Sequence, residues 1–100
     1  MRVTVLGCGG SGGVPLIGGL WGACDPAEPR NRRLRGSILV ETASATILVD
    51  ASPDLRAQLL AAEVHRIDAV IVTQAHGDHV NGLDDLRYAN GLMRRPIPLH

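Results

Sequence analysis

Four short runs of apolar and β-branched residues constrain the fold of this 100-residue chain more than any other feature of the sequence. They occupy residues 2–6, 37–41, 46–50 and 68–73. Each run has the length of a strand and is bounded by turn-forming or charged residues, a pattern typical of strands rather than helices. The run at 68–73 is apolar almost throughout, so we expect it to be central in a β-sheet.

Two further segments carry helical signals. At 52–54, Ser-Pro-Asp combines a hydroxyl cap, a proline in the first turn and a negative charge near the positive end of the helix dipole. Leucines at 55, 59 and 60 then predict the buried stripe of a helix that ends near residue 63. Residues 79–93 repeat apolar side chains at helical spacing, and "PIPL" at 96–99 begins a last strand. Helices and strands in this arrangement predict the α+β class.

The stretch "VTVLGCGGSGGVP" places glycines at 7, 9 and 12, a spacing that also occurs in dinucleotide-binding turns. Such a turn requires a helix directly after it, because the pyrophosphate lies at the helix N-terminus. Here Pro15 and the further glycines at 18 and 19 disfavour a helix. We therefore favour, over a nucleotide site, a glycine-rich turn in which the backbone passes close to another element. This turn opens a long ordered loop over residues 7–36.

Charge and hydropathy narrow the possible partners. Ten basic and ten acidic side chains give a formal net charge of +0, which removes any bulk electrostatic argument for nucleic acid or an anionic membrane. No apolar run approaches the roughly 20 residues that cross a bilayer. We therefore expect a cytoplasmic protein with no membrane partner and no specific nucleic-acid partner. The two cysteines, Cys8 and Cys24, are expected to be reduced and at least partly buried.

The residues able to perform chemistry are concentrated in "VIVTQAHGDHVNGLDDL", where His76, Asp78 and His79 fall within four positions after the central strand. Positions 74 and 76 of an extended segment project to one side, and Gly77 permits a sharp turn that brings the next two residues inward. Imidazole nitrogen and carboxylate oxygen suit zinc, manganese or iron. The alternative is that Asp78 caps a helix and the histidines are surface residues. We favour the metal site.

This segment, with "VLGCGGSGGVPLIGG", "RNRRLRGSILVE" and "ILVDASPDLR" before it, resembles the N-terminal half of a metallo-β-lactamase-superfamily hydrolase, in the branch of the phosphoribosyl cyclic phosphate phosphodiesterase. The resemblance implies an αββα sandwich, of which residues 1–100 supply half of a single domain: one mixed β-sheet with helices on one face. It also implies a metal-dependent hydrolase that cleaves a small phosphodiester with a metal-activated water. His76, Asp78 and His79 would be ligands of Zn²⁺ or Mn²⁺. Asp78 would also orient the water, as the catalytic residue.

The chain departs from the family pattern T-H-x-H-x-D-H at one ligand, because Gln74 stands in place of the first histidine. An amide oxygen is a weaker zinc ligand than imidazole, so the resemblance implies that one of two metal positions is weakened while Asp78 and His79 remain usable. Relatives also carry a cysteine cluster for a structural zinc. Here Gly19 and Trp21 stand where cysteines would align, and we do not expect that zinc.

Half of a sandwich would leave one face of its sheet uncovered, which a small domain tolerates poorly. We therefore expect either a longer protein or a homo-oligomer that covers this face. Together with Gln74, this expectation keeps a second hypothesis open, namely a catalytically silent module of the same fold with a binding or assembly role.

Other polar residues have two interpretations each. Asp50 either braces the metal-binding loop through hydrogen bonds or is an ordinary turn acid. Asp84 and Asp85 are expected to be solvated helix charges or to pair with Arg87 or Arg94. The arginines of the long loop either contact phosphate or form a solvated charged surface; they are Arg30, Arg32, Arg33 and Arg35.

Overall fold

The computed structural model describes residues 1–93 and 95–100. In chain order its elements are β1 (Arg2–Gly7), the 3-10 helix η1 (Pro29–Asn31), β2 (Ser37–Glu41), β3 (Thr46–Val49), α1 (Leu55–Ala61), β4 (Ala69–Ile71), α2 (Gly77–Val80), the 3-10 helix η2 (Leu83–Asp85) and α3 (Leu86–Met93). A strand therefore forms at each of the four predicted runs, and β1 extends one residue beyond its run.

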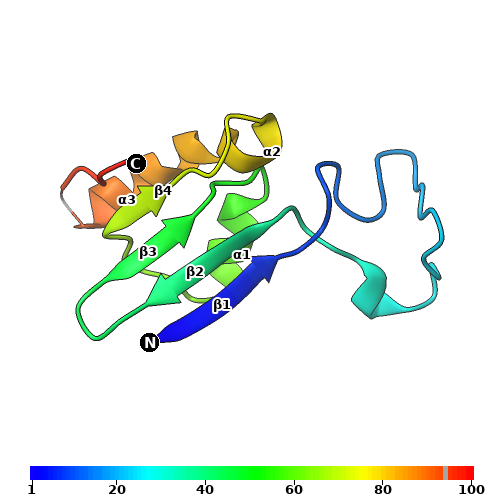
Figure 1. Cartoon of the computed structure of the whole chain (residues 1–100), viewed down its shortest axis with the longest axis horizontal. Helices are drawn as coiled ribbons and strands as arrows, with labels where there is room; N and C mark the ends of the chain where they lie inside the picture. The colour runs from blue at the N-terminus through cyan, green and yellow to red at the C-terminus, as the bar shows by residue number, and fades with distance from the viewer. Residues whose placement is uncertain (94) are drawn as a thin grey trace.

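The strands form one mixed sheet in the order β1-β2-β3-β4 (Figure 1). The first two pairs are antiparallel, whereas β3 and β4 are parallel. On its other side β4 bonds to the last residues of the chain: Val70 N donates to the Pro98 carbonyl at 2.9 Å, and His100 N donates to the Val70 carbonyl at 2.8 Å. The run at 68–73 is thus flanked on both sides, as predicted, and the last strand is present as a single bridge.

Strand β4 is shorter than the predicted run because side chains take over the hydrogen bonds beside its ends. Asp68 Oδ2 accepts the backbone N–H of Thr46 at 2.6 Å. Beyond the other end, the backbone N–H of Thr73 donates to the carboxylate of Asp50 at 2.8 Å. These carboxylates hold the strand in register without extending the ladder.

The first predicted helix starts later and ends earlier than the sequence indicated. The predicted hydroxyl cap is wrong, because the N-cap of α1 is Asp54, whose side chain makes no capping hydrogen bond. Ser52 Oγ instead accepts the backbone N–H of Asp54 at 3.1 Å, within the turn before the helix. The same hydroxyl donates to Gln58 Oε1 at 2.9 Å, which ties the turn to the buried face of the helix. A non-helical turn occupies residues 53 and 54, and α1 itself begins at Leu55.

The second predicted helix, over 79–93, is wrong as a single element, because it is divided into α2, η2 and α3. The division occurs at Gly82, whose backbone N–H donates to the Ala51 carbonyl at 2.9 Å. A Cβ atom at Gly82 would lie 1.9 Å from the Ser52 carbonyl oxygen. The chain must therefore pass against residues 51–52 at this point, which a regular helix with side chains could not do.

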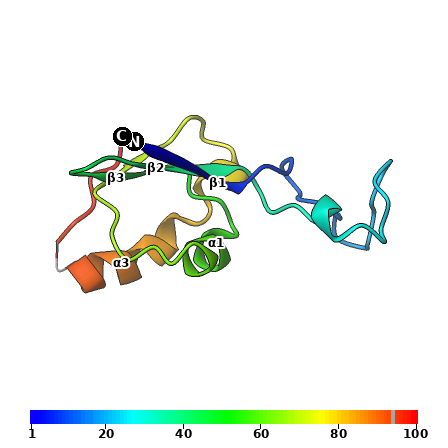
Figure 2. The same cartoon turned by 90° about the horizontal axis from the view of Figure 1, so that it is seen from below.

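Helices cover one face of the sheet, and the core lies between them (Figure 2). The buried apolar side chains of this core are Leu39, Leu48, Ala51, Leu55, Ile67, Val70 and Leu86. On the opposite face the strand register aligns Val5, Ile38, Val49 and Ile71 in one row across the sheet. Val5 is 62% exposed there. The expected uncovered apolar face is therefore present.

Residues 8–36, called the arm below, project away from the sheet and its helices (Figures 1 and 2). At its base, Arg35 Nη1 lies 3.0 Å from Asp54 Oδ1, and Gln58 Nε2 donates to the Arg35 carbonyl at 2.8 Å. A Cβ atom at Gly7 would lie 2.1 Å from that same carbonyl oxygen. The predicted role of the glycine turn, a close approach of backbone to another element, is confirmed. No helix in the described part of the chain is long and apolar enough to span a membrane.

Candidate metal centre

The candidate site lies where the parallel strands β3 and β4 end on the same edge of the sheet. Asp50 directly follows β3, and the segment from Thr73 to His79 follows β4. Because parallel strands run in the same direction, their carboxyl ends bring together residues far apart in the sequence. The backbone N–H of Asp50 donates to the Ile71 carbonyl at 2.8 Å, which joins the two strand ends.

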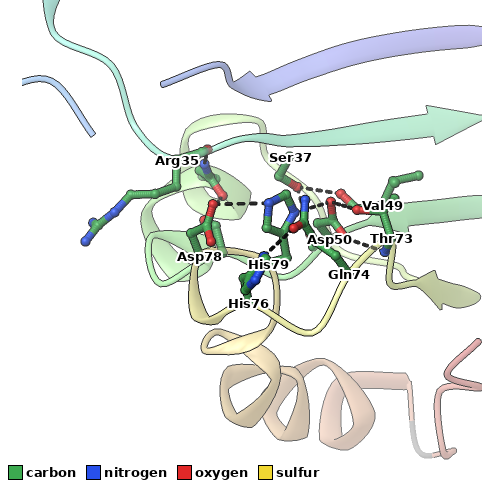
Figure 3. A network of polar contacts seen from close by, with 11 residues as sticks. Arg35, Ser37, Val49, Asp50, Thr73, Gln74, His76, Asp78 and His79 are labelled. Carbon is green, nitrogen blue, oxygen red and sulfur yellow. Dashed lines mark hydrogen bonds and ion pairs between the residues drawn. The ribbon is translucent and has the colours of Figure 1, made fainter. Parts of the chain in front are cut away.

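Asp50 is the centre of the hydrogen-bond network (Figure 3). Its Oδ1 accepts the Thr73 backbone N–H at 2.8 Å, and its Oδ2 accepts the Thr73 hydroxyl at 2.7 Å. Oδ2 also lies 2.6 Å from His79 Nδ1. Asp50 adopts the left-handed region with φ of 64°, and the buried Ser37 hydroxyl donates to its carbonyl at 2.9 Å. Asp50 is therefore both a turn residue and a brace of the loop after β4.

Charge in this network favours the ionised carboxylate and the protonated imidazole. Burial alone would raise the pKa of Asp50, but hydrogen bonds from Thr73 and His79 outweigh it, and the pKa of Asp50 is lowered. The hydrogen bond to Asp50 raises the pKa of His79, against the effect of partial burial, and the negative charges of Asp50 and Asp78 add to this increase.

Asp78 and His79 lie together in α2, immediately beyond this brace. His79 Nε2 is 3.1 Å from Asp78 Oδ2, while its other ring nitrogen faces Asp50. The turn is held from both sides, because His79 N donates to the His76 carbonyl at 2.9 Å and the His79 carbonyl accepts Ala51 N at 2.9 Å. The sequence predicted this inward turn after Gly77, and the structure has it.

The His76 ring belongs to a different pair. Its Nδ1 is in hydrogen-bond contact with Gln74 Oε1, two residues earlier in the extended segment, and both side chains are exposed (Figure 3). Positions 74 and 76 do project to one side, as predicted. Among residues 1–93 and 95–100, however, no three His, Cys, Asp or Glu side chains converge as metal ligands would. The structure thus presents two pairs of donors rather than one cluster.

The donor types in these pairs fit a divalent cation. Two imidazoles, one carboxylate and one amide oxygen match the chemistry of zinc or manganese sites. Asp78 Oδ2 and His79 Nε2 lie 3.1 Å apart, and the contact between His79 Nδ1 and the Asp50 carboxylate fixes the orientation of the ring. The sequence analysis missed Ser37, whose hydroxyl donates to the Asp50 carbonyl. The one sequence feature that could have indicated it is its position, a polar residue at the start of β2 before an apolar run.

The remaining candidates lie elsewhere. Arg35 is held by Asp54, whereas Arg30 pairs with Glu28 at 2.9 Å on the arm. The Arg32 guanidinium lies 5.1 Å from the centre of the Trp21 ring. Phosphate contact by the arm stays a prediction.

Two minor expectations have clear outcomes. Asp84 is an exposed charge 3.6 Å from Arg87, whereas Arg94 lies outside the described residues. The expectation that the cysteines are partly buried is wrong, because Cys8 and Cys24 are both exposed free thiols. Cys8 and Cys24 belong to the arm, which projects into solvent and offers little surface to bury them.

Comparison with known proteins identifies the family. The model of the beta-lactamase superfamily domain matches residues 45–100, which include the Asp50 brace and all four donors. The chain belongs to the metallo-β-lactamase superfamily. Its sheet, with helices on one face and the other face uncovered, corresponds to part of the fold of that superfamily. The predicted fold class is confirmed.

Individual relatives of this superfamily are much longer than the chain. It is 47% identical over 88 residues to an octanoyltransferase of Porphyromonas gingivalis, which covers 87% of this chain and 18% of that protein. A diphosphatase from the PhnP family superposes with a TM-score of 0.83 at 38% identity, covering 97% of this chain and 40% of that one. Zn²⁺-bound PqqB from Methylobacterium extorquens superposes with a TM-score of 0.75 at 30% identity, covering 99% and 36%. The chain thus spans less than half the length of each.

Proposed function

We propose that this chain is the metal-binding part of a hydrolase that cleaves a small phosphodiester. The observation that carries the proposal is the series of contacts from Asp50 to His79 to Asp78, at 2.6 Å and 3.1 Å. A histidine that ligates a metal usually has its other ring nitrogen held by a carboxylate or carbonyl in this way. The braced imidazole and the neighbouring carboxylate are donors that Zn²⁺ and Mn²⁺ accept.

Each residue of the site has a task in this proposal. Asp78 and His79 would hold one ion, and His76 would be a ligand of a second metal position, which Gln74 would weaken. A bound divalent cation would act as a Lewis acid and lower the pKa of a water molecule. Because the Asp50 carboxylate only accepts hydrogen bonds, it keeps a proton on His79 Nδ1 and leaves the Nε2 lone pair for the metal once the ring is neutral. Asp78 would also accept a hydrogen bond from the attacking water and orient it.

Two of the similar structures support the finer parts of this proposal. The relative with a TM-score of 0.83 is a diphosphatase, which favours a phosphorus-containing substrate for this chain. The structure of PqqB contains Zn²⁺, which favours zinc. Both are properties of those proteins. They support the proposal for this chain only because it shares their fold and has the donor residues described above.

The test measures metal content and hydrolysis together. We expect the purified protein to retain zinc or manganese after gel filtration, by elemental mass spectrometry, and to hydrolyse bis-p-nitrophenyl phosphate. Asp78→Asn should lose both properties. Asp84→Asn, which removes an exposed carboxylate six residues away in the same segment, should keep both. A protein that contains no stoichiometric metal and does not hydrolyse the diester would contradict the proposal.

A catalytically silent module is the second candidate, and Gln74 is the observation that favours it. In this case the uncovered face of the sheet would serve assembly, with a second copy of the chain against the row that includes Val5. Sedimentation velocity separates the candidates: a metal-free, inactive oligomer that Val5→Glu converts to a monomer supports the module. A monomeric protein that binds metal contradicts it.

A further inference from the structure

The two donor pairs differ in how firmly the fold holds them. The His79 ring is held on both nitrogens, by Asp50 at 2.6 Å and Asp78 at 3.1 Å, and its side chain is 19% exposed. The His76 ring has a single hydrogen-bond partner among the described residues, the amide of Gln74 (Figure 3). Gln74 and His76 are both exposed, so the second pair lacks an orienting group behind it.

The pairs also differ in charge and in donor type. Asp78 contributes a full negative charge beside its imidazole, whereas Gln74 contributes a neutral carbonyl oxygen. Carbonyl oxygens suit hard ions such as Mn²⁺ and Mg²⁺, while imidazole suits Zn²⁺. Affinity for a divalent ion at sites with oxygen and nitrogen donors generally rises from Mn²⁺ to Zn²⁺, so replacing one nitrogen donor by a neutral oxygen removes more zinc affinity than manganese affinity.

We propose that Gln74 sets the metal preference of the centre: the Asp78–His79 pair binds the first ion tightly, and the Gln74–His76 pair binds a second ion weakly, with little preference for Zn²⁺ over Mn²⁺. This inference rests on the proposed function, because it assumes that both pairs face the metal centre. It adds to that function a metal preference that depends on Gln74. The protein would accordingly change its metal content with the manganese supply while keeping the first ion.

The experiment compares three forms of the protein: wild type, Gln74→His and Gln74→Glu. Histidine supplies a nitrogen donor, whereas glutamate supplies a charged oxygen donor of nearly the same size as the native side chain. Zn²⁺ and Mn²⁺ are titrated separately by isothermal calorimetry, and the electron paramagnetic resonance of bound Mn²⁺ reports occupancy independently of catalysis. His65→Gln, which changes an exposed histidine outside the site, is the matched control for incidental metal binding.

For the weaker ion, we expect Gln74→His to raise the ratio of zinc affinity to manganese affinity by about tenfold, a typical size for a change beside a metal. Gln74→Glu should tighten manganese more than zinc, and the first ion should be unchanged in both variants. Equal ratios in the three forms, or two equal zinc sites in the wild type, would overturn the inference and leave the proposed function standing. Failure of every form to bind either ion would overturn both.

Discussion

Replacing Asp50 by asparagine reverses two hydrogen bonds at the candidate metal centre, those from the Thr73 hydroxyl and from His79 Nδ1. In the native network Asp50 Oδ1 accepts the Thr73 backbone N–H, while Oδ2 accepts both the Thr73 hydroxyl and His79 Nδ1. The asparagine amide keeps an oxygen for the backbone and places an NH₂ group against the imidazole. His79 must then accept on Nδ1 and carry its proton on Nε2, the nitrogen that faces Asp78.

The expected costs in folding stability and in metal-binding free energy are similar in size. A hydrogen bond to a charged group contributes about 1.5–3 kcal/mol, so we expect Asp50→Asn to lower the free energy of unfolding by about that amount. Asparagine tolerates the left-handed backbone at φ of 64°, which avoids a further backbone cost. Loss of a carboxylate behind a metal-ligating histidine typically weakens metal affinity by about 10- to 100-fold, or about 1.4–2.8 kcal/mol.

Urea unfolding followed by far-UV circular dichroism measures the first effect, and zinc titration calorimetry measures the second. Tryptophan fluorescence is unsuitable, because Trp21 lies on the arm rather than in the core. Asp68→Asn is the matched control, since Asp68 also accepts a backbone N–H and pairs with arginines but lies outside the site. If Asp50→Asn and Asp68→Asn bind zinc equally well, the proposed role of Asp50 behind His79 is refuted.

Three further results are expected. The pKa of His79 is raised in the folded protein, so the stability that its protonated form contributes is present below about pH 6.5 and is lost as pH rises through the folded pKa. In metal-free protein the urea midpoint should therefore fall over that pH range. His79→Gln should abolish this fall. Gly82→Ala places Cβ 1.9 Å from a backbone carbonyl oxygen, which should cost about 3 kcal/mol in urea unfolding. By contrast, Gly91→Ala at an open helix position should stabilise by up to about 1 kcal/mol, and equal effects of the two substitutions would contradict the packing argument. Asp54→Asn removes the charge that pairs with the Arg35 guanidinium at the base of the arm and leaves one oxygen for the Arg35 backbone N–H. Trypsin should then cleave the arm faster, and an unchanged rate would show that this ion pair does not hold the arm.

Local patterns predicted those parts of the fold that depend on near neighbours. The strands around Leu39, Leu48 and Val70 were predicted because a short run of branched apolar residues has little alternative to a sheet. The close approach at Gly7 followed from residues 7–15 alone, since proline and repeated glycines exclude a helix there. The break at Gly82 did not follow, because the helical spacing continues through it and the obstacle is the carbonyl of Ser52, 30 residues earlier.

The candidate site divides in the same way. Its donor residues could be predicted, because His76, Asp78 and His79 lie within four positions, and the glycine before Asp78 indicates a turn. Their grouping could not, because the pairing of His79 with Asp50 spans 29 residues and depends on the parallel alignment of β3 with β4.

By itself, then, the sequence determined which segments become strands, where the chain turns and which side chains are available to bind a cation. These properties arise from steric preferences and hydrogen bonding within a few residues. Only the tertiary structure decided that the donors form two unequal pairs, that Asp50 supports one of them and that Arg35 anchors the arm. Those relations depend on which strand ends meet at one edge of the sheet, and that meeting is produced by burial of the shared core rather than by any local pattern.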